Sequence, residues 1–82
     1  MSSVYNYVVH FITTNSNYRV EEINSGIHIV ESGIISSILL VELVSSLERD
    51  FDITFEPEDM DEQNFSLIGK FCDFVEGKIA AA

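Results

Sequence analysis

Apolar residues along the chain predict three helices. In the first segment they recur at intervals of three and four, the repeat of one helix face, so we expect a helix over about residues 3–14. A second stripe follows two serines and predicts a helix from Ser37 to Asp50. A third predicts a helix from Ser66 to Ile79. The three stripes consist of Val4, Tyr5, Val8, Phe11, Ile12, then Leu40, Leu43, Val44, Leu47, Phe51, and finally Leu67, Ile68, Phe71, Cys72, Val75, Ile79.

The segment between the first two helices, residues 13–36, has no sustained helical stripe. It contains several asparagines and glycines, which favour turns and loops over helices. We therefore predict a long loop, and long loops in compact domains are often functional. The apolar side chains expected to pin this loop to the core are Ile23, Ile27, Ile29 and Val30.

The segment between the second and third helices is acidic. Pro57 lies within it, and eight acidic residues fall in positions 48–62, a composition that excludes a long buried element. A short helical turn near residues 61–64 is still compatible with this pattern, and Ile53 and Phe55 are expected to pack inward. The predicted fold is all-α, a small four-helix bundle of three main helices and one short helix, with a long loop between helices 1 and 2.

The length of the chain limits how it can be stabilised. Eighty-two residues make one small domain that buries only about 60 to 65% of its unfolded surface. The single cysteine, Cys72, cannot form an internal disulfide, and no Cys/His cluster has the spacing of a zinc site. Helix packing must therefore stabilise the fold. We expect one domain over residues 1–79 and a C-terminal tail over 80–82, natural or added, without a role in function.

The net charge of the chain limits the classes of partner that it is expected to bind. Fourteen acidic against four basic residues give a formal net charge of −10, opposite in sign to what nucleic acid attracts. Such a surface favours proteins with basic patches. The first residues lack the basic and long apolar regions of a secretory signal, and no run of about 18 apolar residues occurs. We expect a cytoplasmic protein with no nucleic-acid and no membrane partner.

The candidate site is the serine pair at the start of the second helix. Serine is a favoured helix N-cap, worth about 0.5 to 2 kcal/mol, and either Ser36 or Ser37 can fill that role. If Ser36 is the cap, the hydroxyl of Ser37 becomes available to a partner enzyme. From the residues alone, Ser37 is either a second capping residue or an attachment point.

The order of elements resembles the acyl and peptidyl carrier protein family over nearly the whole chain. That family often has Asp-Ser-Gly-Leu-Leu-Asp-Ser-Leu before its recognition helix, where this chain has ESGIISSI over residues 31–38. VEL at 41–43, LE at 47–48 and FDI at 51–53 are similar to further family landmarks. NFS at 64–66 is similar to the approach to the last helix in free-standing aminoacyl carriers related to D-alanyl carrier proteins.

The resemblance implies a function. Ser37 falls on the serine that bears 4′-phosphopantetheine, which a phosphopantetheinyl transferase moves from coenzyme A. The chain is then a carrier rather than an enzyme: it holds an acyl or aminoacyl group as a thioester and shuttles it between partner enzymes. An acyl- or aminoacyl-activating ligase and a downstream acyltransferase or condensing enzyme are the implied partners. A free-standing monomer with the NFS segment favours specialised, natural-product biosynthesis.

The resemblance also implies a docking surface on the second helix. Apolar contacts come from the first turns and charges from two glutamates, although outside the family context such glutamates are ordinary solvated charges. The chain departs from the family in having Ser36 for Asp, Ile38 for Leu and Leu39 for a polar residue. The predicted docking residues are Ser36, Ile38, Leu39, Val41, Glu42 and Glu48.

Other interpretations are possible for the same residues. Ser36 in place of Asp is also compatible with an unmodified, carrier-like acidic interaction domain. Oxygen ligands in residues 50–61 vaguely resemble a calcium loop, but Phe55 occupies the position that needs glycine for the sharp turn. His10 and His28 lack metal-site spacing and are expected on a helix surface and in a loop. Cys72 is expected to be buried and inert, and no metal site is predicted.

Overall fold

Three α-helices and two short 3₁₀ helices make up the fold of the computed structural model, which describes residues 3–81. The α-helices are α1 (Ser3–Asn15), α2 (Ser37–Phe51) and α3 (Ile68–Ala81), and the 3₁₀ helices are η1 (Val20–Glu22) and η2 (Pro57–Asp59). Across residues 3–81 the chain forms no β-strand, only an isolated bridge between His28 and Leu67. The all-α carrier-type bundle and the positions of its three main helices are confirmed.

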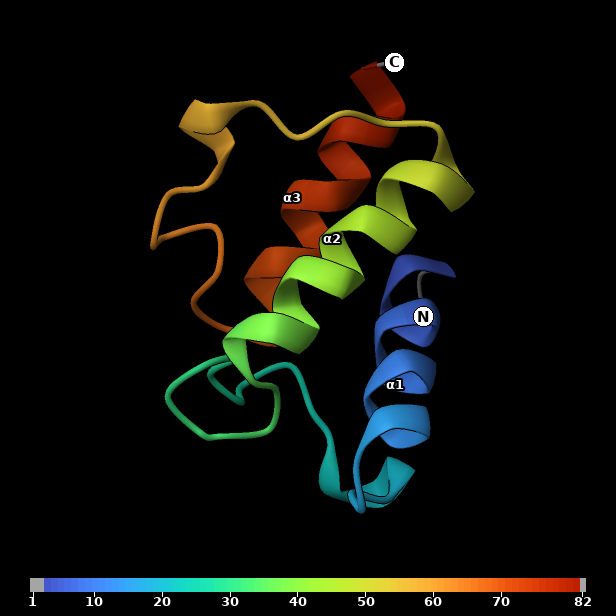
Figure 1. Cartoon of the computed structure of the whole chain (residues 1–82), viewed down its shortest axis with the longest axis vertical. Coiled ribbons are helices and arrows are strands. Elements are labelled where there is room, and N and C mark those ends of the chain that lie inside the picture. Colours follow the sequence, from blue (N-terminus) through green and yellow to red (C-terminus); the bar gives the residue numbers. More distant parts are fainter. Residues whose placement is uncertain (1–2, 82) are drawn as a thin grey trace.

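The helices are arranged so that two of them begin at the same end of the molecule. In Figure 1, α1 descends on the right, the α1–α2 connection turns at the bottom, and α2 and α3 both rise from there. The α2–α3 connection crosses the top and returns along the left side (Figure 1). The first residues of α2 therefore lie at the end where the α1–α2 connection packs, opposite the C-terminus.

The core is entirely apolar and draws on all three α-helices and both connections. Its buried members are at most 9% exposed, and the radius of gyration, 11.7 Å, equals that of a fully folded domain of this length. The long connections are thus packed against the helices and not extended. The buried residues are Val4, Val8, Val9, Ile12, Ile23, Ile29, Ile34, Ile35, Leu43, Val44, Leu47, Ile53, Phe65, Ile68, Phe71, Cys72 and Val75.

The side chains that anchor the α1–α2 connection in the core are only partly those predicted. Ile23 and Ile29 are buried and Ile27 packs partly against the core, but Val30 is 43% exposed, so its prediction as a buried pin was wrong. Val30 begins a tight turn in which its carbonyl accepts from the N–H of Gly33 at 3.0 Å, and this turn directs its side chain to solvent. The segment also contains η1, which the pattern did not predict.

The α2–α3 connection is fixed by aromatic rings and by the ion pair between Lys78 and Asp59. Ile53 is buried, and Phe55, as predicted, packs inward. Its ring lies 6.4, 6.5 and 6.0 Å from the rings of Phe65, Phe71 and Phe74. The pattern did not predict η2 at Pro57–Asp59, where the proline suits the first helical position, whereas the short turn predicted near residues 61–64 is present. Residues 61–65 form two successive hydrogen-bonded turns.

The last helix continues through Ala81, so residues 80–81 of the predicted tail belong to α3, and Ala82 lies outside the described residues. Its face toward the core carries Ile68, Phe71 and Val75, as the stripe predicted. Within residues 3–81, no helix is both long and apolar enough to cross a membrane.

Candidate functional site

Ser36 caps helix α2. Its backbone is extended (φ −79°, ψ 165°), and its Oγ accepts a hydrogen bond from the N–H of Leu39 at 3.2 Å. This satisfies one of the N–H groups that a helix start leaves without an intrahelical partner. The prediction that Ser36 fills the capping role is confirmed by this geometry.

Ser37 is the first residue of α2 and is exposed. Because Ser36 provides the cap, the hydroxyl of Ser37 makes no hydrogen bond to any residue in 3–81. No side chain of the described chain thus has to move before an enzyme can reach this oxygen. The two adjacent serines therefore have different local environments, one engaged by the backbone and one open to solvent.

The approach to Ser37 is a compact turn ending in two buried isoleucines. Gly33 has φ +79°, a left-handed conformation that side-chain-bearing residues rarely adopt. The turn delivers Ile34 and Ile35 into the core, with exposed fractions of 4% and 3%. The sequence pattern missed these two residues as anchors. Their burial fixes the backbone immediately before the serine pair.

The predicted docking residues fall into two groups. Ile38 and Val41 are 75% and 62% exposed, and Glu42 is exposed one helical turn after Ile38, as Val41 is one turn after Ser37. Leu39, by contrast, is half-buried and packs against the core. Glu48 is half-buried as well.

Glu48 is engaged inside the molecule. Its Oε2 accepts a hydrogen bond from the N–H of Phe55 at 2.8 Å, and its backbone carbonyl accepts from the left-handed C-cap Asp52 (φ 54°). The carboxylate therefore joins the end of α2 to the following connection. The structure brings Ser37, Ile38, Val41 and Glu42 together and leaves Glu48 tied to a different part of the fold.

Charge is scarce around Ser37 despite the net charge of −10. The first turn of α2 contains no acidic residue, and Glu42 is the first acidic side chain along the helix. Exposed acidic side chains are instead concentrated in the α2–α3 connection, at Glu56, Glu58, Asp61 and Glu62. On α2, the exposed large side chains next to the free hydroxyl are therefore apolar, and the nearest charge on this helix lies at the second turn.

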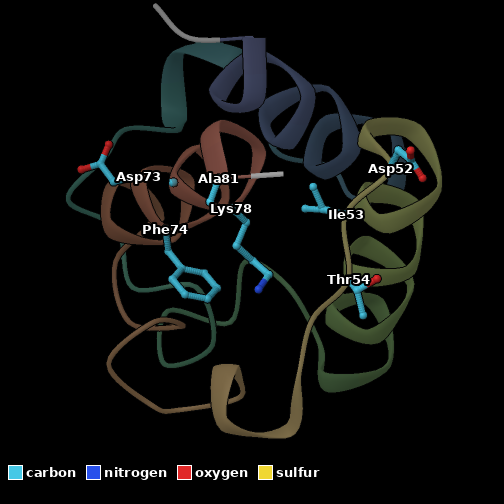
Figure 2. A pocket seen from close by; sticks show the side chains of 8 residues that line it. Asp52, Ile53, Thr54, Asp73, Phe74, Lys78 and Ala81 are labelled. Atoms are coloured by element: carbon cyan, nitrogen blue, oxygen red, sulfur yellow. The ribbon is translucent and has the colours of Figure 1, made fainter.

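A pocket of about 550 Å³ lies away from this site. Figure 2 shows it between Phe74 and Lys78 of α3 and Ile53 and Thr54 of the α2–α3 connection. These residues come from the C-terminal ends of α2 and α3, opposite the start of α2 (Figure 1). The Lys78 amine is already paired with Asp59, at 2.6 Å. The cavity therefore does not contribute a group to Ser37.

The titratable groups with shifted pKa values also lie elsewhere. A hydrogen bond from the Tyr7 hydroxyl, then one from Arg49, lowers the pKa of Asp50 at the far end of α2. Burial raises the pKa of the Cys72 thiol to about 12, which confirms the expectation of a buried, inert cysteine. His10 is exposed on α1 and His28 lies in a loop, as predicted. Within residues 3–81, no three His, Cys, Asp or Glu side chains are grouped to hold a metal ion.

A small helical bundle that presents a free serine hydroxyl at a helix start, without a catalytic group beside it, is a carrier-type domain. Comparison with known families supports this class. Residues 7–75 match the family described as "phosphopantetheine attachment site", and the chain belongs to that family. No curated protein matches the chain.

Family membership defines the cofactor and the class of activity. Domains of this family bind 4′-phosphopantetheine covalently and act as non-catalytic carriers. An exposed serine oxygen that accepts and donates no internal hydrogen bond fits such a group, because an ester can form there without disrupting the cap at Ser36. The D-alanyl subgroup suggested by residues 64–66 is not part of what this match establishes.

Proposed function

We propose that Ser37 carries the phosphopantetheine and that the chain shuttles an acyl or aminoacyl group between partner enzymes. The observation that supports this most directly is the free, exposed hydroxyl of Ser37 at the start of α2. It falls within the 69 residues, 7–75, that match the family. The neighbouring hydroxyl of Ser36 is already used by the helix.

In the attachment step, Ser37 Oγ is the atom of this chain that forms the new bond. This oxygen attacks the phosphorus of coenzyme A that bears the pantetheine, forming a serine O–P bond as the pyrophosphate O–P bond breaks. Adenosine 3′,5′-bisphosphate leaves, and the serine proton passes to a base of the phosphopantetheinyl transferase. Once attached, the group supplies a terminal thiol that holds cargo as a thioester. This chain positions Ser37 and keeps its hydroxyl accessible.

The docking surface we propose consists of Ile38, Val41 and Glu42. Ile38 follows Ser37 in the chain, Val41 lies one helical turn beyond it, both are largely exposed, and Glu42 supplies the adjoining negative charge. A partner with an apolar patch next to a basic residue complements them. Leu39 supports this surface by packing beneath it, and Ser36 fixes its backbone through the cap. Glu48 acts on the α2–α3 connection instead.

The partners we propose are those of carrier domains in general, and the cargo is suggested by one further segment. Carrier domains interact with a phosphopantetheinyl transferase and with acyl-handling enzymes, here an acyl- or aminoacyl-activating ligase and an acyltransferase or condensing enzyme. The NFS segment at 64–66 supports an aminoacyl-type cargo in natural-product biosynthesis. Loading assays with candidate adenylating enzymes distinguish aminoacyl from fatty or polyketide cargo.

Intact-mass measurement tests the attachment site. Wild-type protein incubated with coenzyme A and a promiscuous phosphopantetheinyl transferase should gain one phosphopantetheine, and Ser37→Ala should gain none. Ser36→Ala is the matched control: it removes the other hydroxyl, should still be modified, and should lose about 0.5 to 2 kcal/mol of stability with the cap.

Two outcomes contradict the proposal. Addition that persists in Ser37→Ala places the attachment elsewhere. No addition to folded wild type, with a known carrier modified in the same reaction, favours the alternative of an unmodified acidic interaction domain.

A further inference from the structure

The ring of His28 ties together the turn that leads to Ser37. Its Nδ1 accepts hydrogen bonds from the backbone N–H groups of Val30, at 3.3 Å, and Glu31, at 3.1 Å. Its Nε2 lies 3.0 Å from Oε2 of Glu31. One ring nitrogen thus accepts while the other donates to a carboxylate. This pattern requires a neutral imidazole with its proton on Nε2.

The same hydrogen-bonded network continues toward the serine pair. The carbonyl of His28 accepts from both the N–H and the hydroxyl of Ser32, and the Ser32 hydroxyl accepts from the N–H of Ile34 at 3.2 Å. Ile34 enters the core, and two residues later Ser36 caps α2. The shape of the turn around His28 therefore determines where the chain enters α2.

The backbone on the other side of His28 is held by α3. The N–H of Ile29 donates to the carbonyl of Ser66 at 2.8 Å, and the N–H of Ile68 donates to the carbonyl of Ile27 at 2.9 Å. His28 is thus fixed between two backbone hydrogen bonds to the start of α3. A change in its ring therefore acts on the segment that follows it, residues 30–33.

Protonation of the ring is incompatible with this arrangement. A proton on Nδ1 would face the N–H groups of Val30 and Glu31, so both hydrogen bonds must break. Charged groups from three segments of the chain lie around the His28 ring. Glu31 contacts it directly, and Glu62 and Lys70 line the same cavity of about 380 Å³ together with uncharged Gln63 and Ser66.

We propose that His28 is a positioning residue for the modification of Ser37: its neutral ring holds residues 30–33 in the shape that presents the serine, and protonation slows attachment of phosphopantetheine. This inference rests on the proposed function, because it concerns the rate at which Ser37 is modified. It makes loading of the carrier sensitive to pH over the range in which histidine side chains change charge, about pH 5 to 8.

The test compares wild type with His28→Asn across that range. The asparagine side chain keeps an oxygen that can accept from the N–H groups two and three residues ahead, but it does not titrate. Initial rates of phosphopantetheine attachment are measured by intact mass at about pH 8 and about pH 5. At each pH, the wild-type rate is divided by the His28→Asn rate. This ratio removes the pH dependence of the transferase itself.

We expect this ratio to be near one at the higher pH and to fall about fivefold or more at the lower, as two hydrogen bonds are lost in wild type alone. His28→Phe, which fills the space without an acceptor, should be slow at both pH values. A ratio that does not change with pH overturns the proposal. So does a His28→Phe variant that is as fast as wild type.

A second readout separates failure of this inference from failure of the proposed function. Ring ¹⁵N shifts at the higher pH should show the Nε2–H tautomer, and the amide ¹H shifts of Val30 and Glu31 should move as His28 titrates. Amides that stay unchanged through the titration overturn the inference even if Ser37 is modified. If the amides respond but Ser37 gains no phosphopantetheine at either pH, the proposed function fails, and with it the effect on attachment.

Discussion

The two connections on either side of α2 are held by different physical means. The α1–α2 connection depends on buried isoleucines, a left-handed glycine and short-range hydrogen bonds around His28. The α2–α3 connection depends on the Phe55 ring cluster and on Lys78, whose amine pairs with Asp59 and lies 5.8 and 5.6 Å from the centroids of Phe55 and Phe74. The first presents Ser37 on an apolar surface, while the second carries much of the negative charge.

This difference separates two parts of partner recognition. For the partners proposed above, charges on the acidic connection act over several ångströms and would steer a basic partner toward the molecule, an effect that salt weakens. Contact at Ile38 and Val41 is short-range and apolar, and salt affects it little. Under the proposed function, the part of the surface that orients an enzyme on Ser37 is therefore not the part that attracts it.

The largest expected effect concerns the buried side of the first connection. Ile35→Ala removes a 3%-exposed side chain and should cost about 2 to 5 kcal/mol of unfolding free energy, because it leaves a cavity beside the serine pair. Ile38→Ala makes the same chemical change at a 75%-exposed site and should change stability by less than about 0.5 kcal/mol. Urea unfolding followed by circular dichroism measures both.

If Ile35→Ala is unfolded without urea, Ile35→Val provides a milder test, with an expected loss of about 0.5 to 1.5 kcal/mol. Equal losses at residues 35 and 38 would show that the first connection is not anchored as described.

The next effect concerns the ion pair of the second connection. Lys78 and the Glu56 N–H lower the pKa of Asp59 below its usual value of about 3.9, so the pair stabilises the fold above about pH 4 and loses this contribution as the pH falls through the lowered pKa. Lys78→Met should reduce the urea midpoint at neutral pH, and the gap from wild type should narrow as Asp59 is protonated.

Lys70→Met is the matched control, since Lys70 is an exposed lysine on the same helix. It should change the urea midpoint less than Lys78→Met at neutral pH. A gap between Lys78→Met and wild type that is the same at neutral and acidic pH would mean that packing of the lysine stem on the two rings, and not its charge, holds the connection.

The smallest effect compares one substitution at two glycines. Gly33→Ala forces a side chain into a left-handed conformation in the turn before Ser37 and should cost about 1 kcal/mol. Gly77→Ala introduces the same methyl group into helix α3, where nothing lies within 4 Å, and should stabilise by about 0.5 to 1 kcal/mol. Thermal unfolding distinguishes the two, and shifts in the same direction would be inconsistent with the turn geometry.

The sequence by itself determined the elements whose formation depends on local periodicity and local hydrogen bonding. Three- and four-residue repeats of apolar side chains predicted α1, α2 and α3, since a helix places such positions on one face whatever it packs against. Ser36 could be identified as the cap because capping involves only a residue and the N–H groups just after it. The resemblance over residues 31–53 then placed Ser37 at the start of the helix.

Only the tertiary structure decided which side chains of the connections are buried and which polar groups are engaged. In irregular backbone, the direction of each side chain depends on the dihedral angles of a particular turn, so Val30 faces solvent while Ile34 and Ile35 enter the core. The role of Glu48 depended on a partner seven residues away, at Phe55. His28 became significant only once the turn brought two backbone N–H groups to one ring nitrogen, a geometry that has no periodic signature in the sequence.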